Sequence, residues 1–272
     1  MHRTAWTLTV LHVLALGLGL VGILVVVPHP EAIVRGAAAT AFFAYALLHT
    51  GAISLVLAAL ALIAYGGPAI GWWRTLVFAA VSCAISAAAE LTGTATGWPF
   101  GGYAYTGLLG PKILERVPYS VPISWFFMGF AGYLLALAIV QKRWRGGWGG
   151  GLASALLGAW LLTGWDLVLD PAMASPSLGV LRFWTWFEHG PYFGMPLRNL
   201  VGWFGTGLVF IGVARLLWRT EPSVPASSLR IPFVIYTANV VWAMALSLSA
   251  GLWQSALLAV AFSLVPAVVA LA

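Results

Sequence analysis

The stretch that decides the fold is residues 37–64, AAATAFFAYALLHTGAISLVLAALALIA, which carries no charged side chain from end to end. A helix needs about 20 predominantly apolar residues to cross the roughly 30 Å hydrocarbon core of a bilayer. Residues 37–64 exceed that length, so they predict a membrane-spanning helix. The flanking segment from Glu31 to Arg35 is expected to lie in the headgroup region.

The rest of the chain has the same character. Of its 272 residues, 61% are hydrophobic and 7% are charged, whereas a soluble domain carries about 25% charged residues. We predict an all-α fold, a polytopic integral membrane helix bundle of about eight transmembrane helices forming a single membrane domain over residues 1–272. The expected spans are 5–27, 37–64, 72–92, 121–141, 150–170, 197–218, 231–249 and 252–271. The break at residues 249–251 is thin, which leaves seven spans as the alternative.

The basic residues predict the orientation. The formal net charge is +6, and cytoplasmic loops of membrane proteins carry an excess of Lys and Arg. With a cytoplasmic N-terminus, the cytoplasmic side holds the larger group: Arg3, Arg74, Lys142, Arg143, Arg145, Arg215, Arg219 and Arg230. The other side holds Arg35, Lys112, Arg116, Arg182 and Arg198. We therefore expect a multi-pass protein of the cell membrane with its N-terminus inside, and no nucleic-acid partner, because these charges are scattered over loops.

The acidic residues are distributed unevenly. Only seven exist, and Glu90, Asp166, Asp170 and Glu188 fall near the ends of the third and fifth predicted spans or in the following loop. Both spans run in the same direction, so these carboxyl groups are expected near one face of the membrane. Asp166 and Asp170 are spaced i, i+4 and share one helix face. Ionisable groups at such depth are costly and indicate a functional site. Alternatively, Asp170 marks a helix end before Pro171 and bonds to water.

Two loops stand out, residues 93–120 and 171–197, and we predict that they form the site. Each is dense in Gly and Pro, as in GWPFGGYAYTGLLGP at 97–111, so neither continues a helix. At membrane depth such backbone is tolerated only when it is buried in protein or lines a cavity. Aromatic residues gather in and beside these loops, either as an interfacial belt or as the wall of a site. They are Trp98, Tyr103, Tyr105, Trp125, Trp165, Trp184 and Trp186.

Metal ligation is not indicated. His2, His12, His29 and His49 lack the spacing of metal ligands, and Cys83 is the single cysteine. We therefore predict no metal site.

The sequence resembles a known family in two segments. The first runs from Glu90 through Tyr105 and continues with 118–125; the second runs from Trp165 through Asp170-Pro171 to Asn199 and Trp203. They are similar to the bacterial and archaeal membrane proteins of the CruF-type carotenoid hydratase family, and the likeness covers roughly residues 70–220. The resemblance implies a hydro-lyase that adds water across the terminal 1,2 double bond of an acyclic carotenoid end and gives a tertiary alcohol. It implies gamma-carotene, lycopene or longer bacterioruberin precursors as substrates, with water, the lipid bilayer and other carotenoid-pathway enzymes as partners.

Acid–base chemistry fits the carboxyl groups. Hydration of a trisubstituted alkene needs a proton donor and a water molecule but no cofactor, so we expect none. A carboxylic acid stays protonated in an apolar site or beside a second carboxylate. We expect Asp166 or Asp170 to protonate the alkene and Glu90 or the other aspartate to deprotonate the water. Of the aromatic residues above, five would stabilise the cation or grip the polyene: Trp165, Trp184, Trp186, Tyr103 and Tyr105. Trp98 and Trp125 are also expected to bind substrate, and Asn199 would bond the water or cap its helix.

Three other functions compete with hydration. An intramembrane prenyltransferase would use the Asp166-x-x-x-Asp170 pair for magnesium and diphosphate, but it needs a second acidic cluster that the sequence lacks. A lycopene cyclase also begins with alkene protonation and excludes water. A carotenoid or lipid carrier would use the same cavity without turnover, although repeated halves of the transporter type are missing from the sequence.

Overall fold

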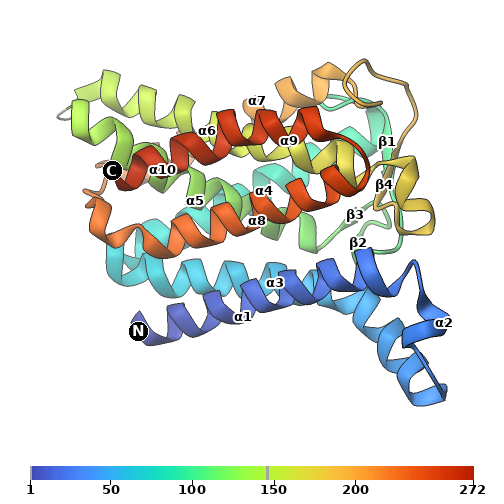
Figure 1. The fold of residues 1–272 in the computed structure, drawn as a ribbon. Coiled ribbons are helices and arrows are strands. Elements are labelled where there is room, and N and C mark those ends of the chain that lie inside the picture. The colour runs from blue at the N-terminus through green and yellow to red at the C-terminus, as the bar shows by residue number, and fades with distance from the viewer. Residues whose placement is uncertain (1, 145–146) are drawn as a thin grey trace.

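The computed structural model describes residues 2–144 and 147–272, which form one helical bundle (Figure 1). In this part of the chain eight helical segments are long and apolar enough to cross a membrane. Their elements are α1 (His2–Val21) continued by the π-helical η1 (Gly22–Val26), α3 (Ala37–Ile70), α4 (Trp72–Thr96), α5 (Ser120–Arg143), α6 (Gly147–Met173), α7 (Leu197–Trp218), α8 (Arg230–Ser249), and a last span made of α9 (Trp253–Ala259), η4 (Val260–Leu264) and α10 (Val265–Leu271). The prediction of an all-α, multi-pass membrane fold is confirmed.

The C-terminal segment resolves the choice between seven and eight spans. Helix α8 ends at Ser249, and Gly251 adopts a positive φ of 76°, a conformation that glycine reaches without steric cost. The chain then reverses, because α9 packs on α8 and on α6. Figure 1 shows α9 and α8 running side by side in opposite directions. The seven-span alternative is therefore wrong.

Helices α5 and α6 occupy the centre of the bundle. Most of α5 is fully buried, including Tyr133, whereas α1 and α3 present many apolar side chains to the outside. Small residues let α5 and α6 approach closely, since a Cβ atom on Gly158 would lie 3.1 Å from the Cα atom of Tyr133. Such small-residue contacts are how membrane helices gain van der Waals packing without a hydrophobic driving force between them.

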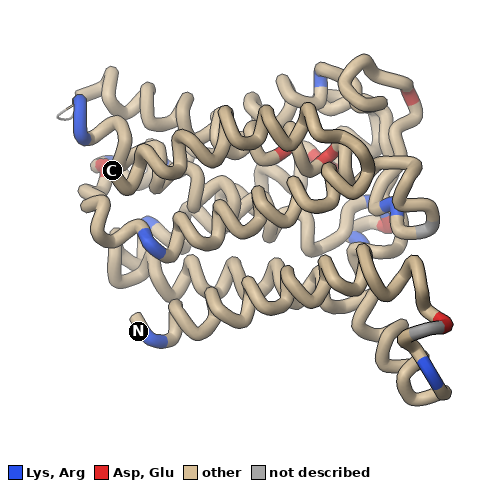
Figure 2. The backbone as a smooth tube through the Cα atoms, in the orientation of Figure 1, with Lys and Arg blue, Asp and Glu red and all other residues tan. Residues whose placement is uncertain are grey.

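The Lys and Arg residues gather at the two ends of the bundle (Figure 2). Both termini lie at one end, which also carries Arg74, Lys142 and Arg143 in the loops and helix ends nearby. Arg145, which we counted with this group, lies outside the described residues. Three of the acidic residues are placed differently: Glu90, Asp166 and Asp170 are buried inside the bundle, near the C-terminal ends of α4 and α6.

The two Gly- and Pro-rich loops cover the end of the bundle opposite both termini. Between α4 and α5 the chain forms β1 (Tyr103–Tyr105), β2 (Lys112–Ile113) and β3 (Val117–Pro118); between α6 and α7 it forms the 3-10 helix η2 (Pro176–Leu181) and β4 (Trp184–Trp186). Strand β1 pairs antiparallel with β4, with Tyr103 opposite Trp186 and Tyr105 opposite Trp184. A short α2 (Pro30–Ile33) and a 3-10 turn η3 (Ala226–Ser228) complete the connections. The loops predicted to form the site are thus joined by backbone hydrogen bonds.

A tight turn before α7 depends on glycine. The Gly190 N–H donates to the Gly194 carbonyl oxygen at 2.9 Å, and a Cβ atom on Gly190 would lie 2.1 Å from the carbonyl oxygen of Met195. Backbone cannot move aside as a flexible side chain does, so Gly190→Ala is expected to lower stability by about 3 kcal/mol, at the upper end of overpacking costs. Thermal unfolding of the purified protein in detergent measures this loss of stability. Gly205→Ala in α7 is the control, because a Cβ atom there meets nothing within 4 Å; equal melting temperatures for the two variants would contradict the prediction.

Candidate active site

Two aspartates and one asparagine form the first part of the site. Asp166 and Asp170 lie one turn apart on α6 and are buried, with Asp170 only 4% exposed. The side-chain nitrogen of Asn199, in the first turn of α7, donates to Asp166 Oδ2 at 2.9 Å and to Asp170 Oδ2 at 2.7 Å. The ion pairs found among the described residues, Arg198–Glu188 and Arg215–Glu221, involve neither aspartate. The two carboxyl groups therefore share one neutral amide.

Helix α6 continues past Asp170, although Pro171 follows it. Proline lacks an N–H, so the carbonyl oxygen four residues earlier, on Leu167, loses its helical donor. The Tyr192 hydroxyl donates to this oxygen at 2.8 Å, and α6 extends to Met173. Asp170 therefore does not mark the end of α6 as the alternative expected, because the loop after η2 satisfies the backbone oxygen that Pro171 leaves without a donor.

Glu90 forms the second part of the site. It lies near the end of α4, is buried, and accepts three side-chain hydrogen bonds. Trp125 of α5 donates its indole N–H to Glu90 Oε1 at 2.9 Å. The Tyr105 hydroxyl donates to Oε2 at 2.9 Å, and the Tyr103 hydroxyl donates to the same oxygen. Three donors around one carboxyl group favour its anionic form and oppose the cost of burying that charge in apolar surroundings.

The β1–β4 pair aims both tyrosines at Glu90. Residues two apart on a strand point to the same face, so Tyr103 and Tyr105 reach the same carboxyl oxygen. Their rings pack on the partner strand, with ring centroids 5.3 Å apart for Tyr103 and Trp186 and 5.8 Å apart for Tyr105 and Trp184. The two loops thus position donors for a carboxyl group that belongs to a different element.

Because Tyr103 and Tyr105 are buried beside Glu90, we expect the protein to lose stability at alkaline pH. Burial, and then the negative charge of Glu90, raise the pKa of Tyr103 and of Tyr105 well above its ordinary value. The folded state therefore keeps both protons when unfolded tyrosine, with a pKa of about 10, releases them. Their contribution to stability is complete below about pH 10 and decreases as the pH rises towards the folded pKa values.

Replacing both tyrosines tests this effect. We expect the double variant Tyr103→Phe/Tyr105→Phe to be less stable at pH 8 and to lose less stability than the wild type between pH 9.5 and 11. Melting temperatures between pH 9.5 and 11 measure this loss of stability for each variant. Tyr119→Phe, at an exposed position, should leave the wild-type slope unchanged; a double variant with the wild-type slope would contradict the prediction.

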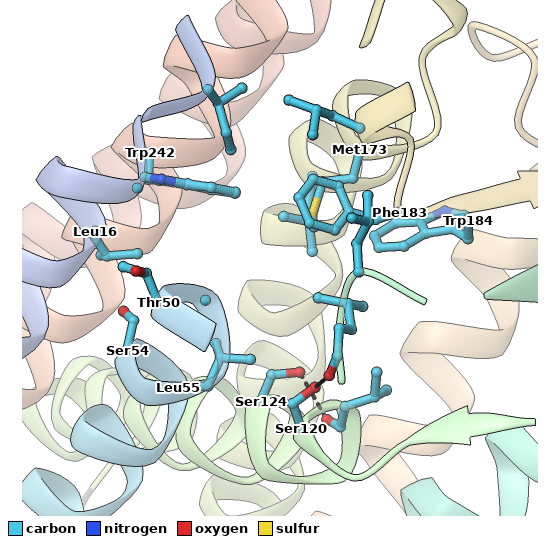
Figure 3. A pocket seen from close by; sticks show the side chains of 18 of the residues that line it. Leu16, Thr50, Ser54, Leu55, Ser120, Ser124, Met173, Phe183, Trp184 and Trp242 are labelled. Carbon is cyan, nitrogen blue, oxygen red and sulfur yellow. Dashed lines mark hydrogen bonds between the residues drawn. The ribbon is translucent and has the colours of Figure 1, made fainter. Parts of the chain in front are cut away.

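A cavity of about 380 Å³ extends from the carboxyl groups towards α1, η1, α3 and α8. Glu90, Asp170 and Asn199 line one part of it, while Asp166 is not among the lining residues. The opposite wall comes from α1, η1, α3 and α8, and apart from a few polar groups it is apolar. Figure 3 shows Leu16, Thr50 and Trp242 facing Met173 and Phe183 across the space.

Most of the residues predicted to bind substrate do line this cavity. These are Tyr103, Tyr105, Trp165, Trp184, Trp186 and Asn199. Trp125 is instead fully buried behind Glu90 and stacked on Trp203, with ring centroids 3.9 Å apart. Trp98 is not brought to the cavity. Its side chain is 70% exposed, because α4 ends at Gly97 in the left-handed conformation and the chain turns outwards there.

Sequence reasoning missed the opposite half of the wall. Thr50 and Ser54 of α3 and Trp242 of α8 line that half. On the carboxyl side, Trp203 of α7 was also missed; it lines the cavity and its ring packs between Trp125 and Trp165. Thr50 and Ser54 are spaced i, i+4 in an otherwise apolar span. That spacing is the signal that would have pointed to them, although small hydroxyl residues are common between membrane helices.

Together these features define a class of protein: a multi-pass membrane protein with buried acidic groups at one end of a largely apolar cavity. The profile of a family described as "Carotenoid biosynthesis protein" matches residues 50–266. The chain belongs to this carotenoid biosynthesis protein family.

A curated relative is similar to part of the chain. Bisanhydrobacterioruberin hydratase from Haloarcula japonica is 34% identical over 122 residues, a match that covers 45% of this chain and 38% of that relative. The matched part is thus less than half the length of the relative. No solved structure matches this chain.

Proposed function

We propose that this protein is a carotenoid hydratase that adds water across the terminal 1,2 double bond of an acyclic carotenoid end. The observation that carries the proposal is that Asp170 and Glu90 line the same apolar cavity. Such a cavity accepts a hydrocarbon chain, and two carboxyl groups in different surroundings supply an acid and a base. The similarity to a hydratase over 122 residues supports the same reaction class.

The cavity suits the end of a long polyene. Its walls include the aromatic rings of Trp165, Trp184 and Trp186, which offer flat apolar faces. A volume of about 380 Å³ is that of a pocket for a small ligand, so it holds the reacting end while the rest of the chain stays outside. Leu18, Val21 and Phe42 line the cavity and are also exposed on the outer face of the bundle. We propose that the polyene enters there from the lipid.

Asp170 is proposed as the proton donor. It faces the cavity, whereas Asp166 lies behind it and is held by the same Asn199 amide. Two carboxyl groups buried together without a cation cannot both ionise at low cost, so the pair holds a proton. Asp170 delivers that proton to C2 of the alkene, and the electron pair of the double bond forms the new C–H bond. Asp166 and Asn199 act as positioning residues.

The step leaves a tertiary cation at C1. Aromatic faces stabilise a desolvated cation by up to about 2 kcal/mol each, which is a role for Trp165, Trp184 and Trp186. A water molecule donates its oxygen lone pair to C1, and Glu90, whose anion is held by Tyr103 and Tyr105, takes the proton that the water releases. Return of a proton from Glu90 to the aspartate pair completes the cycle, so the net change is addition of one water.

The remaining assignments are also proposals. We propose that gamma-carotene or lycopene is the substrate, that the protein is in the cell membrane, and that its N-terminus is cytoplasmic. The site then lies near the outer leaflet, because α4 and α6 both end on the side opposite to the N-terminus. Other enzymes of the carotenoid pathway would supply the substrate within the same bilayer.

Expression in a bacterium that accumulates lycopene or gamma-carotene tests the reaction. Liquid chromatography with mass detection should reveal a more polar pigment heavier by one water. An isomer of unchanged mass would indicate cyclisation instead. An unchanged pigment profile with the protein present in the membrane would contradict the proposed hydration.

A further inference from the structure

A second cavity, of about 330 Å³, lies at the end of the bundle that the loops cover. Its wall combines the last turn of α4, strand β1 and the β2–β3 hairpin, through Thr94, residues 103–105, Lys112, Leu114, Glu115 and Arg116. Figure 1 shows these strands at the end of the bundle opposite both termini. Three of the lining side chains are charged, whereas the wall of the first cavity is largely apolar. The second cavity is therefore suited to water and not to a hydrocarbon chain.

Two tyrosines are common to the two cavities. Tyr103 and Tyr105 line both of them, whereas Glu90 lines the first cavity only. The hydroxyl groups of both tyrosines donate to Glu90 Oε2. Tyr105 is partly exposed, while Tyr103 is 4% exposed. Strand β1 therefore separates the cavities, and its tyrosines stand between the second cavity and the carboxylate that we propose as the base.

The second cavity lies outward of Glu90 along α4. Thr94 follows Glu90 by one helical turn, so the two side chains share one face of the helix, and Thr94 is about 6 Å nearer its C-terminal end. The Thr94 hydroxyl donates to the Glu90 carbonyl oxygen at 2.9 Å. On the other side of the cavity, Glu115 and Arg116 are exposed. The cavity thus extends from exposed charged side chains to the turn of α4 that follows Glu90.

Two basic side chains hold the wall of the second cavity in place. Lys112 Nζ donates to the Tyr105 carbonyl oxygen at 2.6 Å, and Arg116 donates to the Thr94 carbonyl oxygen at 3.0 Å. These bonds tie the hairpin to β1 and to α4. Each basic side chain has further N–H groups, and the Glu115 carboxylate can accept hydrogen bonds. The lining therefore offers the about two to four polar partners that an ordered water molecule needs.

The proposed reaction needs a separate path for water. Each hydration consumes one water molecule, which must reach Glu90 while the end of the polyene fills the first cavity. The entrance from the lipid, at Leu18, Val21 and Phe42, is apolar, and the rest of the polyene chain occupies it. Moving water through an apolar passage without hydrogen-bond partners is costly. A polar route from the loop end of the bundle avoids that cost.

We propose that the second cavity is the binding site for the substrate water, and that strand β1 passes this water to Glu90. When the Tyr105 hydroxyl releases Glu90 Oε2, a water molecule takes its place beside the carboxylate, and the Tyr103 hydroxyl stays bound to the same oxygen. The proposal rests on the proposed function, because only hydration consumes water. It adds that water arrives from the loop end of the bundle while the polyene arrives from the lipid.

Reversible blocking of the second cavity tests this water path. Ala104 lines the second cavity and not the first, so Ala104→Cys places a thiol there, and Cys83→Ala removes the one native cysteine. The reagent is 2-sulfonatoethyl methanethiosulfonate, whose permanent charge keeps it in water. We expect mass spectrometry to find the new thiol labelled, and the hydration rate to fall by about tenfold, a barrier raised by about 1.4 kcal/mol. Dithiothreitol, which removes the label, should restore the rate.

Two comparisons separate a blocked water path from a distorted site. An achiral polyene such as lycopene gains circular dichroism in its absorption band only when it is bound in a chiral site, so this signal measures binding, and it should be the same before and after labelling. Thr96→Cys, exposed at the end of α4 and lining neither cavity, should be labelled without a change in rate. If Ala104→Cys does not fold, Thr94→Cys takes its place in the same test, because Thr94 also lines only the second cavity.

Three results would overturn the water path: a thiol in the second cavity that the reagent does not label, a labelled protein that hydrates at the unlabelled rate, or a label that abolishes polyene binding as well. Each of them leaves hydration by the unlabelled protein in place. Failure of the proposed function has a different signature, because the unlabelled protein would then bind the polyene and form no hydrated pigment. The water path would be rejected together with hydration in that case.

Discussion

Replacing Asp170 by asparagine is expected to lower the rate of carotenoid hydration by about a thousandfold, in the range that loss of a general acid produces. Asparagine has the shape of the neutral acid but cannot deliver a proton to carbon. Its side-chain oxygen can still accept from Asn199, as Asp170 does now at 2.7 Å. The variant should therefore fold and retain polyene binding. Rates in reconstituted membranes, with induced circular dichroism for binding, measure the two properties separately.

Two further variants make this test specific. Asp166→Asn is expected to have a smaller effect, because Asp166 does not line the cavity and acts through Asp170. Glu188→Gln is the matched control, since Glu188 is an exposed carboxylate paired with Arg198 on the loop before α7. Substantial hydration by Asp170→Asn, with the same binding as the wild type, would reject Asp170 as the acid.

Replacing Glu90 by glutamine is expected to lower the hydration rate by about a hundredfold while leaving the fold intact. The indole of Trp125 can only donate, so the glutamine oxygen must face it and the amide nitrogen must face the tyrosines. The hydroxyl groups of Tyr103 and Tyr105 can accept as well as donate, so they rotate to accept from that nitrogen. Each contact keeps one hydrogen bond, with the direction of the two tyrosine bonds reversed, while the negative charge, the base and the acceptor for the two tyrosine O–H groups are lost.

Leucine at the same position should behave differently. Glu90→Leu leaves the Trp125 N–H and two tyrosine hydroxyl groups without their acceptor, and each buried unsatisfied group costs about 1–3 kcal/mol. We expect a clearly lower melting temperature for Glu90→Leu than for Glu90→Gln, with hydration absent in the first and residual in the second. Wild-type turnover in Glu90→Gln would show that another group accepts the proton.

Much of the fold could be predicted because it depends on local composition. Long apolar runs separated by Gly and Pro predicted the spans within a few residues, and bilayer thickness sets their minimum length. The observed end of a helix differs from the predicted one where a tertiary contact compensates for a residue that is a poor helix former. Pro171 lies within α6 because Tyr192, 25 residues away in sequence, bonds the carbonyl oxygen that proline leaves free. Pairwise contacts of this kind cannot be read from periodicity.

The sequence by itself determined the membrane bundle, the shared membrane face of Glu90, Asp166 and Asp170, and the loops that accompany them. These follow from hydrophobicity, from helix direction and from the rarity of acidic residues in membrane spans. Only the tertiary structure decided that Asp170 rather than Asp166 lines the cavity, that Trp125 supports Glu90, and that Trp98 points outwards. It also assigned half of the cavity wall to α1, α3 and α8. The physical reason is that in lipid every helix is apolar on all sides, so the side chains that face a cavity are selected by packing between helices and not by a pattern along any one of them.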